Sequence, residues 1–185
     1  MKATVAAGLA LLVLTGCEPT SPDRERPANL DDSVAGEIAA DAGTQAHNRP
    51  AAVSTLPVTL GDQTFTLELA LDNDTRFQGL SDRAYLAPDG GMLFVFPRPR
   101  NLEFVMRRCL VPIDIIFLDA GGRVTASHAM TVEPYDRPER QLRRYGSQYR
   151  AQFAIELAGG TLETLDLQPG DRIELPLEDL KARAK

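Results

Sequence analysis

Residues 104–117, FVMRRCLVPIDIIF, bring together side chains that could do chemistry. Cys109 offers a thiol, Asp114 a carboxylate, and Arg107 and Arg108 two guanidinium groups that suit anionic partners. Together with a histidine, a thiol and a carboxylate are the components of a nucleophilic catalytic set. The segment is therefore a candidate for an active site, for the rim of a binding pocket, or for a core strand that carries one satisfied charge.

The nearest histidine along the chain, His128, is expected to lie opposite Asp114. Residues 113–118 and 124–132 alternate as two strands, and a three-residue loop at 120–122 with a left-handed Gly122 would join them as a hairpin. In that register Asp114 faces His128, close enough for a carboxylate–imidazole hydrogen bond. The hairpin therefore predicts a buried Asp–His pair.

This pair supports two hypotheses. Asp114 and His128 could be the acid–base pair of a small hydrolase, but Cys109 lies about 16 Å from Asp114 along an extended strand and does not complete a triad. The favoured hypothesis is structural, because a buried Asp–His pair satisfies two polar groups without doing catalysis. We therefore expect no catalytic residue and no cofactor. With two histidines in the chain, one of them the isolated His47, we expect no metal site.

A second group of arginines lies in the long polar stretch PYDRPERQLRRYGSQYR, residues 134–150. Long loops on a β scaffold often carry function, and arginine and tyrosine suit anionic or carbohydrate-like ligands. The alternative is a solvated loop whose arginines pair with Asp136 and Glu139. The predicted ligand-binding residues are Met106, Arg107, Arg108, Asp114, Arg143, Arg144 and Tyr145.

The elements that position these residues are mostly strands. Alternation and turn signals predict strands at 58–60, 64–70, 90–96, 102–106, 113–118, 124–132, 152–157 and 172–175, and short helices at 76–80 and 161–165. Pro97 and Pro99 are expected to end the third strand. The predicted fold class is α+β with β dominant: a single compact domain with a curled, barrel-like, mostly antiparallel sheet and two short helices.

The N-terminus reads as an export signal. Lys2 precedes an apolar segment at residues 3–13, and the segment ends in Leu-Thr-Gly-Cys, residues 14–17, which resembles the lipobox of bacterial lipoproteins. That resemblance implies cleavage of residues 1–16, lipidation of Cys17 and a membrane anchor. In lipoproteins of bacteria with two membranes, an aspartate directly after the lipidated cysteine tends to keep the protein in the inner membrane. Residue 18 is Glu here, so the expected location is the outer membrane, facing the periplasm. Residues 17–54 are expected to be a disordered tether, residues 55–180 the folded domain and residues 181–185 a tail.

Bulk composition excludes some classes of function. The chain has 185 residues, a formal net charge of −6 and a pI near 5.0, which argues against a nucleic-acid binder. Two cysteines are too few for a disulfide framework. No run of about 20 apolar residues follows the N-terminus, so no transmembrane helix is expected there.

Several blocks in order, among them LDNDTRFQGLSDRAYLAPDGGMLFVFP and FVMRRCLVPIDIIFLDAGGRV, resemble the domain-of-unknown-function family number 192 over residues 56–176. The resemblance implies a compact β-rich fold and no established activity. The family signature usually reads Phe-Trp-Met-Lys-Asn-Thr, followed by a proline and an aspartate. Phe104, Met106, Pro112 and Asp114 match it, whereas Val105, Arg107, Arg108 and Cys109 replace the tryptophan, lysine, asparagine and threonine.

The sequence therefore predicts an envelope lipoprotein whose single domain is a non-catalytic binding or structural module. Its expected partners are the membrane, through the lipid on Cys17, and a small molecule or protein that the sequence does not identify. The alternatives are the small hydrolase that uses Asp114 and His128, and a docking scaffold for another envelope protein. No nucleic-acid partner is expected.

Overall fold

The structure is a computed structural model that describes residues 53–185. The predicted signal peptide, the lipidation site Cys17 and almost all of the predicted tether lie outside the described residues. In the part of the chain that the structure describes, no helix is long and apolar enough to cross a membrane.

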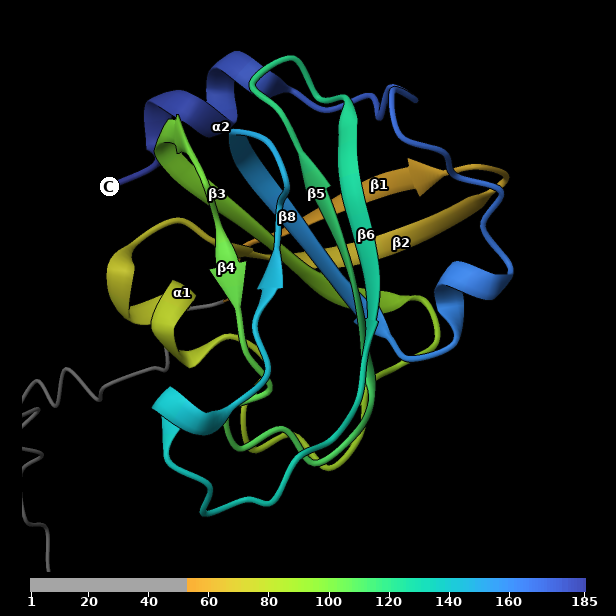
Figure 1. Ribbon diagram of the computed structural model, residues 1–185. Coiled ribbons are helices and arrows are strands. Elements are labelled where there is room, and N and C mark those ends of the chain that lie inside the picture. Colours follow the sequence, from red (N-terminus) through yellow and green to blue (C-terminus); the bar gives the residue numbers. More distant parts are fainter. Residues whose placement is uncertain (1–52) are drawn as a thin grey trace, which may run out of the picture. The chain divides into compact units, whose positions relative to one another are not determined.

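One six-stranded sheet forms the framework of the domain (Figure 1). In order across the sheet, the strands are β1 (Thr55–Leu60), β2 (Gln63–Ala70), β3 (Gly90–Arg100), β8 (Ala151–Ala158), β5 (Ile113–Leu118) and β6 (Val124–Met130). β2 and β3 are parallel and every other pair is antiparallel. The sheet is strongly curved. It is open, with β1 and β6 as its two edges, and does not close into the barrel-like shape that we expected.

Short elements surround the sheet. They are the α-helices α1 (Asn73–Gln78) and α2 (Leu177–Arg183), the 3₁₀ helices η1 (Glu139–Gln141) and η2 (Thr161–Glu163), and the paired short strands β4 (Glu103–Phe104) and β7 (Tyr145–Gly146). The fold is thus β-dominant, as predicted, and has two short α-helices. The second helix that was expected, at 161–165, is the 3₁₀ helix η2. α1 begins at Asn73, because the Asp72 side chain accepts a hydrogen bond from the Thr75 backbone N–H at 2.8 Å and the Thr75 Oγ1 accepts one from the Asp72 backbone N–H at 3.3 Å.

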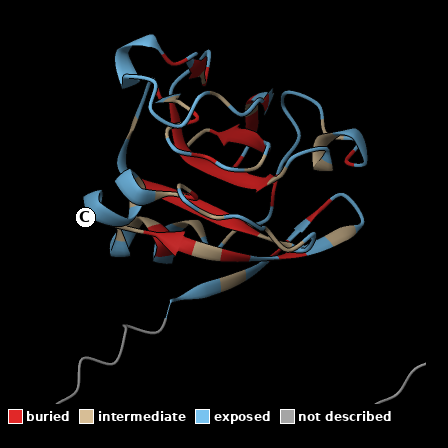
Figure 2. Cartoon of the chain, turned by 90° about the horizontal axis from the view of Figure 1, so that it is seen from below, coloured by how far each residue is buried: buried red, intermediate tan, exposed pale blue. Residues whose placement is uncertain are grey.

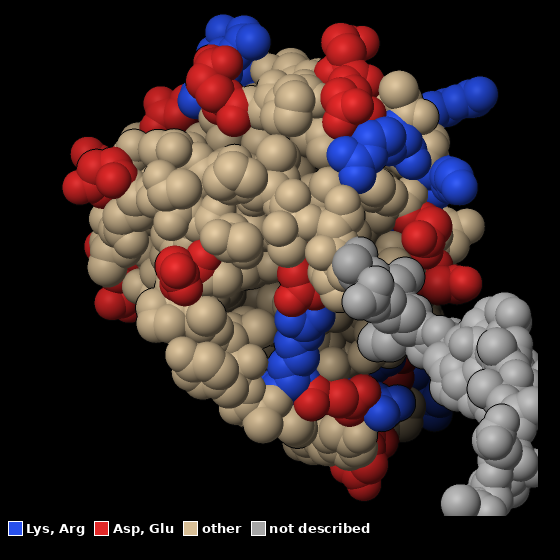
Figure 3. All heavy atoms as spheres, turned by 180° about the vertical axis from the view of Figure 1, so that it is seen from behind, with Lys and Arg blue, Asp and Glu red and all other residues tan. Residues whose placement is uncertain are grey.

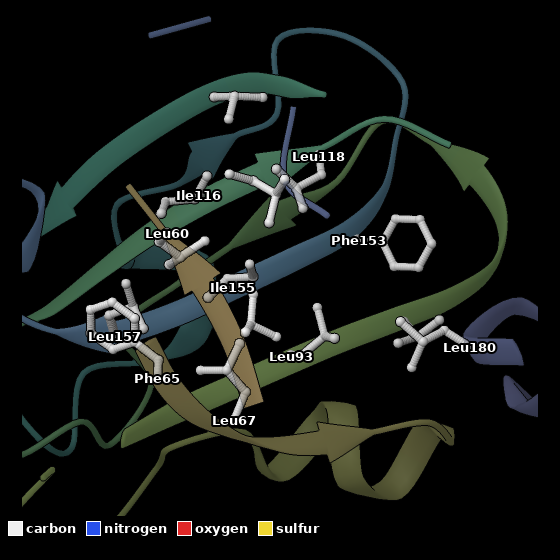
Figure 4. Close-up of a cluster of buried hydrophobic side chains, with 14 of the residues drawn as sticks. Leu60, Phe65, Leu67, Leu93, Ile116, Leu118, Phe153, Ile155, Leu157 and Leu180 are labelled. Atoms are coloured by element: carbon white, nitrogen blue, oxygen red, sulfur yellow. The ribbon is translucent and has the colours of Figure 1, made fainter. Parts of the chain in front are cut away.

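Both faces of the sheet are buried, as the red strands in Figure 2 show. The cluster on one face includes Leu67, Leu93, Ile155 and Leu157 and is covered by α2 through Leu180 (Figure 4). A second cluster on the other face includes residues from β3, β5, β8 and the segment around β4. This second face carries the candidate site.

Several predicted bounds are wrong. The strand expected at 102–106 is only β4, the strand expected at 124–132 ends at Met130, and the helix expected at 76–80 is Asn73–Gln78. β3 continues to Arg100, and its prolines are tolerated because Pro97 and Pro99 lie in an irregularity between the paired residues Val95 and Arg100. The strand predicted at 172–175 is reduced to an isolated bridge between Arg123 and Arg172. α2 was not predicted, and the domain boundary expected at residue 180 falls inside it.

The β5–β6 hairpin begins in the predicted register and then leaves it. Gly122 is left-handed, with a φ of +78°, and Leu118 lies opposite Val124 as expected. Thr125 is then an extra residue, a β-bulge, because the next pair is Phe117 with Ala126. Beyond the bulge every residue of β6 pairs one position away from its predicted partner.

Candidate ligand-binding site

The bulge separates the two residues of the predicted Asp–His pair. Asp114 lies opposite Ala129, whereas His128 lies opposite Ile115, so the two side chains point to opposite faces of the sheet. The His128 Nε2–H donates to the Gly146 carbonyl at 2.8 Å. The predicted register, and the acid–base pair that depended on it, are therefore wrong.

Asp114 has a structural role on its own face. It is 1% exposed, and its Oδ2 accepts a hydrogen bond from the Leu162 backbone N–H at 2.7 Å. Burial raises the pKa of Asp114, while the backbone N–H groups of Leu162, Gly160 and Thr161 lower it. Asp114 thus holds the first turn of η2 against the end of the sheet and does not belong to a ligand site on the other face.

A pocket of about 310 Å³, the α1–β4 pocket, opens on the other face between α1, β3 and β4. The walls are largely aromatic: Phe94 and Phe104 are in edge-to-face contact with ring centroids 5.0 Å apart, and Phe96 lies 6.5 Å from Phe104. Its charged lining residues are Arg76, Arg100, Arg107, Glu103, Glu139 and Glu156. Pockets of this size and lining are typical of small-molecule sites.

Two arginines converge on one aromatic ring at this pocket. The guanidinium of Arg76 lies 5.3 Å from the Phe96 ring centroid, and that of Arg100 lies 4.7 Å from it. Burial lowers the pKa of Arg76, and the like charge of Arg100 lowers it further. Arg76 donates to the Val95 carbonyl at 2.7 Å, but within residues 53–185 Arg100 makes no hydrogen bond or ion pair. Two guanidinium groups at one ring, of which Arg100 has no hydrogen-bond or ion-pair partner in residues 53–185, suit an anion.

Arg107, one of the predicted ligand-binding residues, also lines this pocket. Its guanidinium carbon lies 3.6 Å from the Phe77 ring centroid, and the group also donates to the Phe77 carbonyl. A long ion pair of 3.8 Å joins Arg107 to Glu139, which belongs to the predicted arginine and tyrosine loop. Arg107 therefore connects that loop to the pocket.

Glu156 lies at the interior end of the pocket. Pairing across the sheet places Glu68, Met92, Glu156, Ile115 and His128 in one row on the same face. The side chain of Glu156 is 6% exposed and accepts no hydrogen bond from any group within residues 53–185. Burial raises its pKa to about 8, opposed by the positive charge of Arg83. Glu156 is therefore mostly protonated at neutral pH.

Cys109 also lines the pocket but is not a nucleophile. Burial, with a contribution from the charge of Glu156, raises the pKa of its thiol to about 12. The Sγ–H points to the Arg107 carbonyl oxygen at 3.6 Å. A thiol in this state carries almost no thiolate at neutral pH.

The remaining predicted site residues lie outside the pocket. Arg108 pairs with Asp82 at 2.7 Å and hydrogen-bonds the Tyr135 hydroxyl at 3.0 Å. Met106 is buried in the core. Arg143 and Arg144 are held by other groups: the Arg143 guanidinium lies over the ring of Tyr145, and Arg144 pairs with Glu103 at 3.5 Å. Tyr145 is buried and its hydroxyl accepts a hydrogen bond from the Thr131 N–H.

Sequence reasoning noted Arg100 in a cluster with Arg98, Arg107 and Arg108 but gave no site role to Arg76, Arg100 or Glu156. For Glu156 a signal was present, because a carboxylate interrupts the apolar strand AQFAIELA in the same way that Asp114 interrupts residues 113–118. No local sequence signal was present for Arg76 and Arg100, because their contact with Phe96 depends on how α1 packs against β3. Among residues 53–185, no group of three or more histidine, cysteine or acidic residues is placed to hold a metal ion.

The fold and the pocket define a β-dominant domain with one charged and aromatic cavity beside its sheet. The model of the DUF192 family, described as "Uncharacterized ACR", matches residues 56–175. The chain belongs to this family, which confirms the resemblance found in the sequence. Among curated proteins, none was found to match the chain.

Two crystal structures are similar to this fold. One, from Sinorhizobium meliloti and described as a candidate transcription regulator, is 30% identical over 66% of this chain and 94% of its own, with a TM-score of 0.57. The other, a protein of unknown function from Novosphingobium aromaticivorans, is 27% identical over 76% of this chain and 99% of its own, with a TM-score of 0.59.

Proposed function

We propose that this domain is a non-catalytic binding module whose α1–β4 pocket takes a small ligand with an anionic group. The observation that carries the proposal is Arg100, a guanidinium at the pocket without a partner in residues 53–185, beside Arg76 and above the ring of Phe96. A carboxylate or phosphate would offset the repulsion between the two cations. The aromatic walls would bury the apolar remainder of the ligand.

Binding is favoured over catalysis because, within residues 53–185, the acid–base pair expected from the sequence is not assembled. Asp114 and His128 lie on opposite faces of the sheet, and the Cys109 thiol is protonated. An anionic ligand is favoured over a carbohydrate-like one, because Tyr135 and Tyr149, the exposed tyrosines of the loop, do not line the pocket.

A DNA-binding role does not follow from the description of the S. meliloti structure. This chain has a net charge of −6, and on the face seen in Figure 3 acidic side chains lie beside basic ones rather than apart from them. That face therefore does not present the contiguous basic patch that a duplex requires.

The sequence supports placing this module on the cell envelope. A lipid on Cys17 would anchor the protein, and the polar residues that follow would separate the domain from the membrane. We propose the outer membrane, facing the periplasm, as its location.

The test uses octanoate, which has one carboxylate and an apolar chain, titrated into the full-length protein by calorimetry. Loss of a charge-assisted hydrogen bond weakens binding by about tenfold or more, so Arg100→Gln is expected to lower the affinity by at least that factor. Arg172→Gln is the matched control, because Arg172 pairs with Glu174 and does not line the pocket. Equal affinities of the Arg100→Gln and unchanged proteins would overturn the proposal.

A further inference from the structure

The groups that face Glu156 leave its carboxyl group without a counter-ion. The nearest cation, Arg83, is committed to Glu68 through two hydrogen bonds, one of them 2.7 Å long. Cys109, from the segment after β4, is a neutral thiol, and the next titratable group in the row, His128, is bonded to Gly146. The residues directly beside Glu156, Met92 on β3 and Ile115 on β5, are apolar.

Glu156 is largely buried and lines the cavity, and its carboxyl oxygens keep some accessible surface without a hydrogen-bond partner in residues 53–185, so a ligand ammonium group could pair with the carboxylate there. Burying a carboxyl group without a hydrogen bond is costly, and a cation brought by a ligand would remove that cost. The aromatic walls point in the same direction, because the ring faces of Phe94 and Phe104 attract ammonium groups.

The two charged ends of the pocket are well separated. The Arg100 guanidinium lies over the ring of Phe96. Because Val95 pairs with Phe153, the next residue, Phe96, lies beside residue 152 of β8. Residue 152 is four residues from Glu156 along the same strand. Four residues of a strand span about 13 Å, and Phe94, opposite Ala154, lies between. A free α-amino acid carries both charges on one carbon and is too short to reach both ends.

We infer that the interior end of the α1–β4 pocket binds an ammonium group at Glu156, so that the ligand is an extended zwitterion with its carboxylate at Arg100. A short peptide and an ω-amino acid both belong to this class. The carboxylate half of this inference rests on the proposed function, whereas the ammonium half stands on Glu156 alone.

Binding of the ammonium group displaces a proton. Glu156 starts as a neutral carboxylic acid, and the ligand arrives already protonated as R–NH₃⁺. The O–H bond of Glu156 breaks, the proton passes to solvent, and the carboxylate forms an ion pair with the ammonium. The net result is the release of close to one proton per ligand at pH 7.

Three matched probes separate the two ends: 8-aminooctanoate, whose charges lie roughly 10 Å apart when extended, octanoate without the ammonium, and octylamine without the carboxylate. With the full-length protein, Glu156→Gln is expected to weaken 8-aminooctanoate and octylamine by at least about tenfold and to leave octanoate unchanged. Arg100→Gln is expected to weaken 8-aminooctanoate and octanoate and to leave octylamine unchanged.

The outcomes distinguish this inference from the proposed function. If octanoate binds through Arg100 but the amine adds no affinity, the anion site stands and the ammonium site is overturned. The converse result is that octylamine binds and octanoate does not. If Glu156→Gln then abolishes octylamine binding, the ammonium site is supported and the anion site is overturned. If none of the three probes binds, both are overturned.

Calorimetry in buffers of different ionisation enthalpy adds a readout that a structural role would not change. Binding of 8-aminooctanoate at pH 7 is expected to release close to one proton from the unchanged protein and none from the Glu156→Gln protein. Thermal unfolding of the variant confirms that it is folded. Equal proton release by both proteins would exclude Glu156 as the group that ionises.

Discussion

Glu156 and Asp114 are both buried carboxyl groups in neighbouring strands, and what separates their roles is the set of groups that each one meets. Asp114 accepts hydrogen bonds from the backbone at η2, so the fold itself accounts for its burial. Glu156 meets apolar side chains and a pocket, so the fold leaves its burial uncompensated. A structural role suits the first residue and a ligand role suits the second.

The raised pKa of Glu156 makes stability depend on pH. Its pKa is about 8 in the folded protein and near 4.5 in the unfolded chain, so the folded state binds the proton more tightly. The contribution of this group is fully present below about pH 4.5 and is lost as the pH rises to about 8, at up to about 1.4 kcal/mol per pH unit. Urea unfolding at pH 5, 7 and 9 is expected to show this loss in the unchanged protein and not in Glu156→Gln. Equal pH slopes in the two proteins would contradict the assignment.

Removing the Asp114 side chain is expected to affect stability and not ligand binding. Asp114→Ala leaves the Leu162 backbone N–H without its acceptor, at a cost of about 1–3 kcal/mol in the free energy of unfolding. Asp114→Asn, which keeps one acceptor oxygen, should cost less. Denaturant unfolding measures both, and octanoate affinity should be unchanged in each. A loss of octanoate affinity at unchanged stability would show instead that Asp114 belongs to the ligand-binding site.

At the scale of elements, the patterns that could be read from the sequence are those set by local chemistry. Residues 113–118 were predicted with the observed bounds because a short, mostly apolar run between turn residues, interrupted only by Asp114, fits a strand buried on both faces. The left-handed Gly122 was also predicted from the hairpin loop. The bulge at Thr125 carries no such signal, because threonine is an ordinary strand residue and the extra position is stabilised only by pairing across the hairpin.

The bulge decided how much of the site could be predicted. One unseen residue moved His128 to the face of Glu156 and away from Asp114, so a sound turn prediction still produced a wrong pair. Arg107 was singled out in the sequence because its charge lies beside a predicted strand, which is a local feature, and its role as a ligand residue stays a prediction. Arg76 and Arg100 were given no site role, since they come together only through the packing of α1 on the sheet.

At the scale of the whole molecule, α2 completes the core on the face opposite the pocket. Leu180 is fully buried among residues of the sheet, and Arg76, near the pocket, donates a hydrogen bond to the Lys185 carbonyl beyond the helix. Residues after 180 therefore belong to the folded domain rather than to a tail.

Truncation of the Leu180 side chain tests whether α2 is part of the core. Leu180→Ala is expected to lower the free energy of unfolding by about 2–5 kcal/mol, because it leaves a cavity in the core. Glu178→Ala in the same helix is the control and should change stability by less than about 1 kcal/mol, since its side chain is exposed and pairs only with Lys181. Urea unfolding compares the three proteins, and similar midpoints for all would show that α2 is not part of the core.

The anchor prediction concerns the other end of the chain. Cys17→Ala is expected to move the protein from the membrane fraction to the soluble fraction, because the lipid attachment site is lost. Cys109→Ala is the matched control and should stay with the membrane. Fractionation followed by immunoblotting measures both, and a Cys17→Ala protein that remains with the membrane would contradict lipidation at that residue.

The position of Phe77 has a practical consequence. Its ring is 70% exposed at the pocket and lies under the Arg107 guanidinium, and the whole chain contains no tryptophan. Phe77→Trp would therefore give the protein a single indole fluorophore, located at the cavity and in contact with the Arg107 guanidinium. All tryptophan emission from such a protein would come from the pocket, so ligand arrival could be followed in real time without any added label.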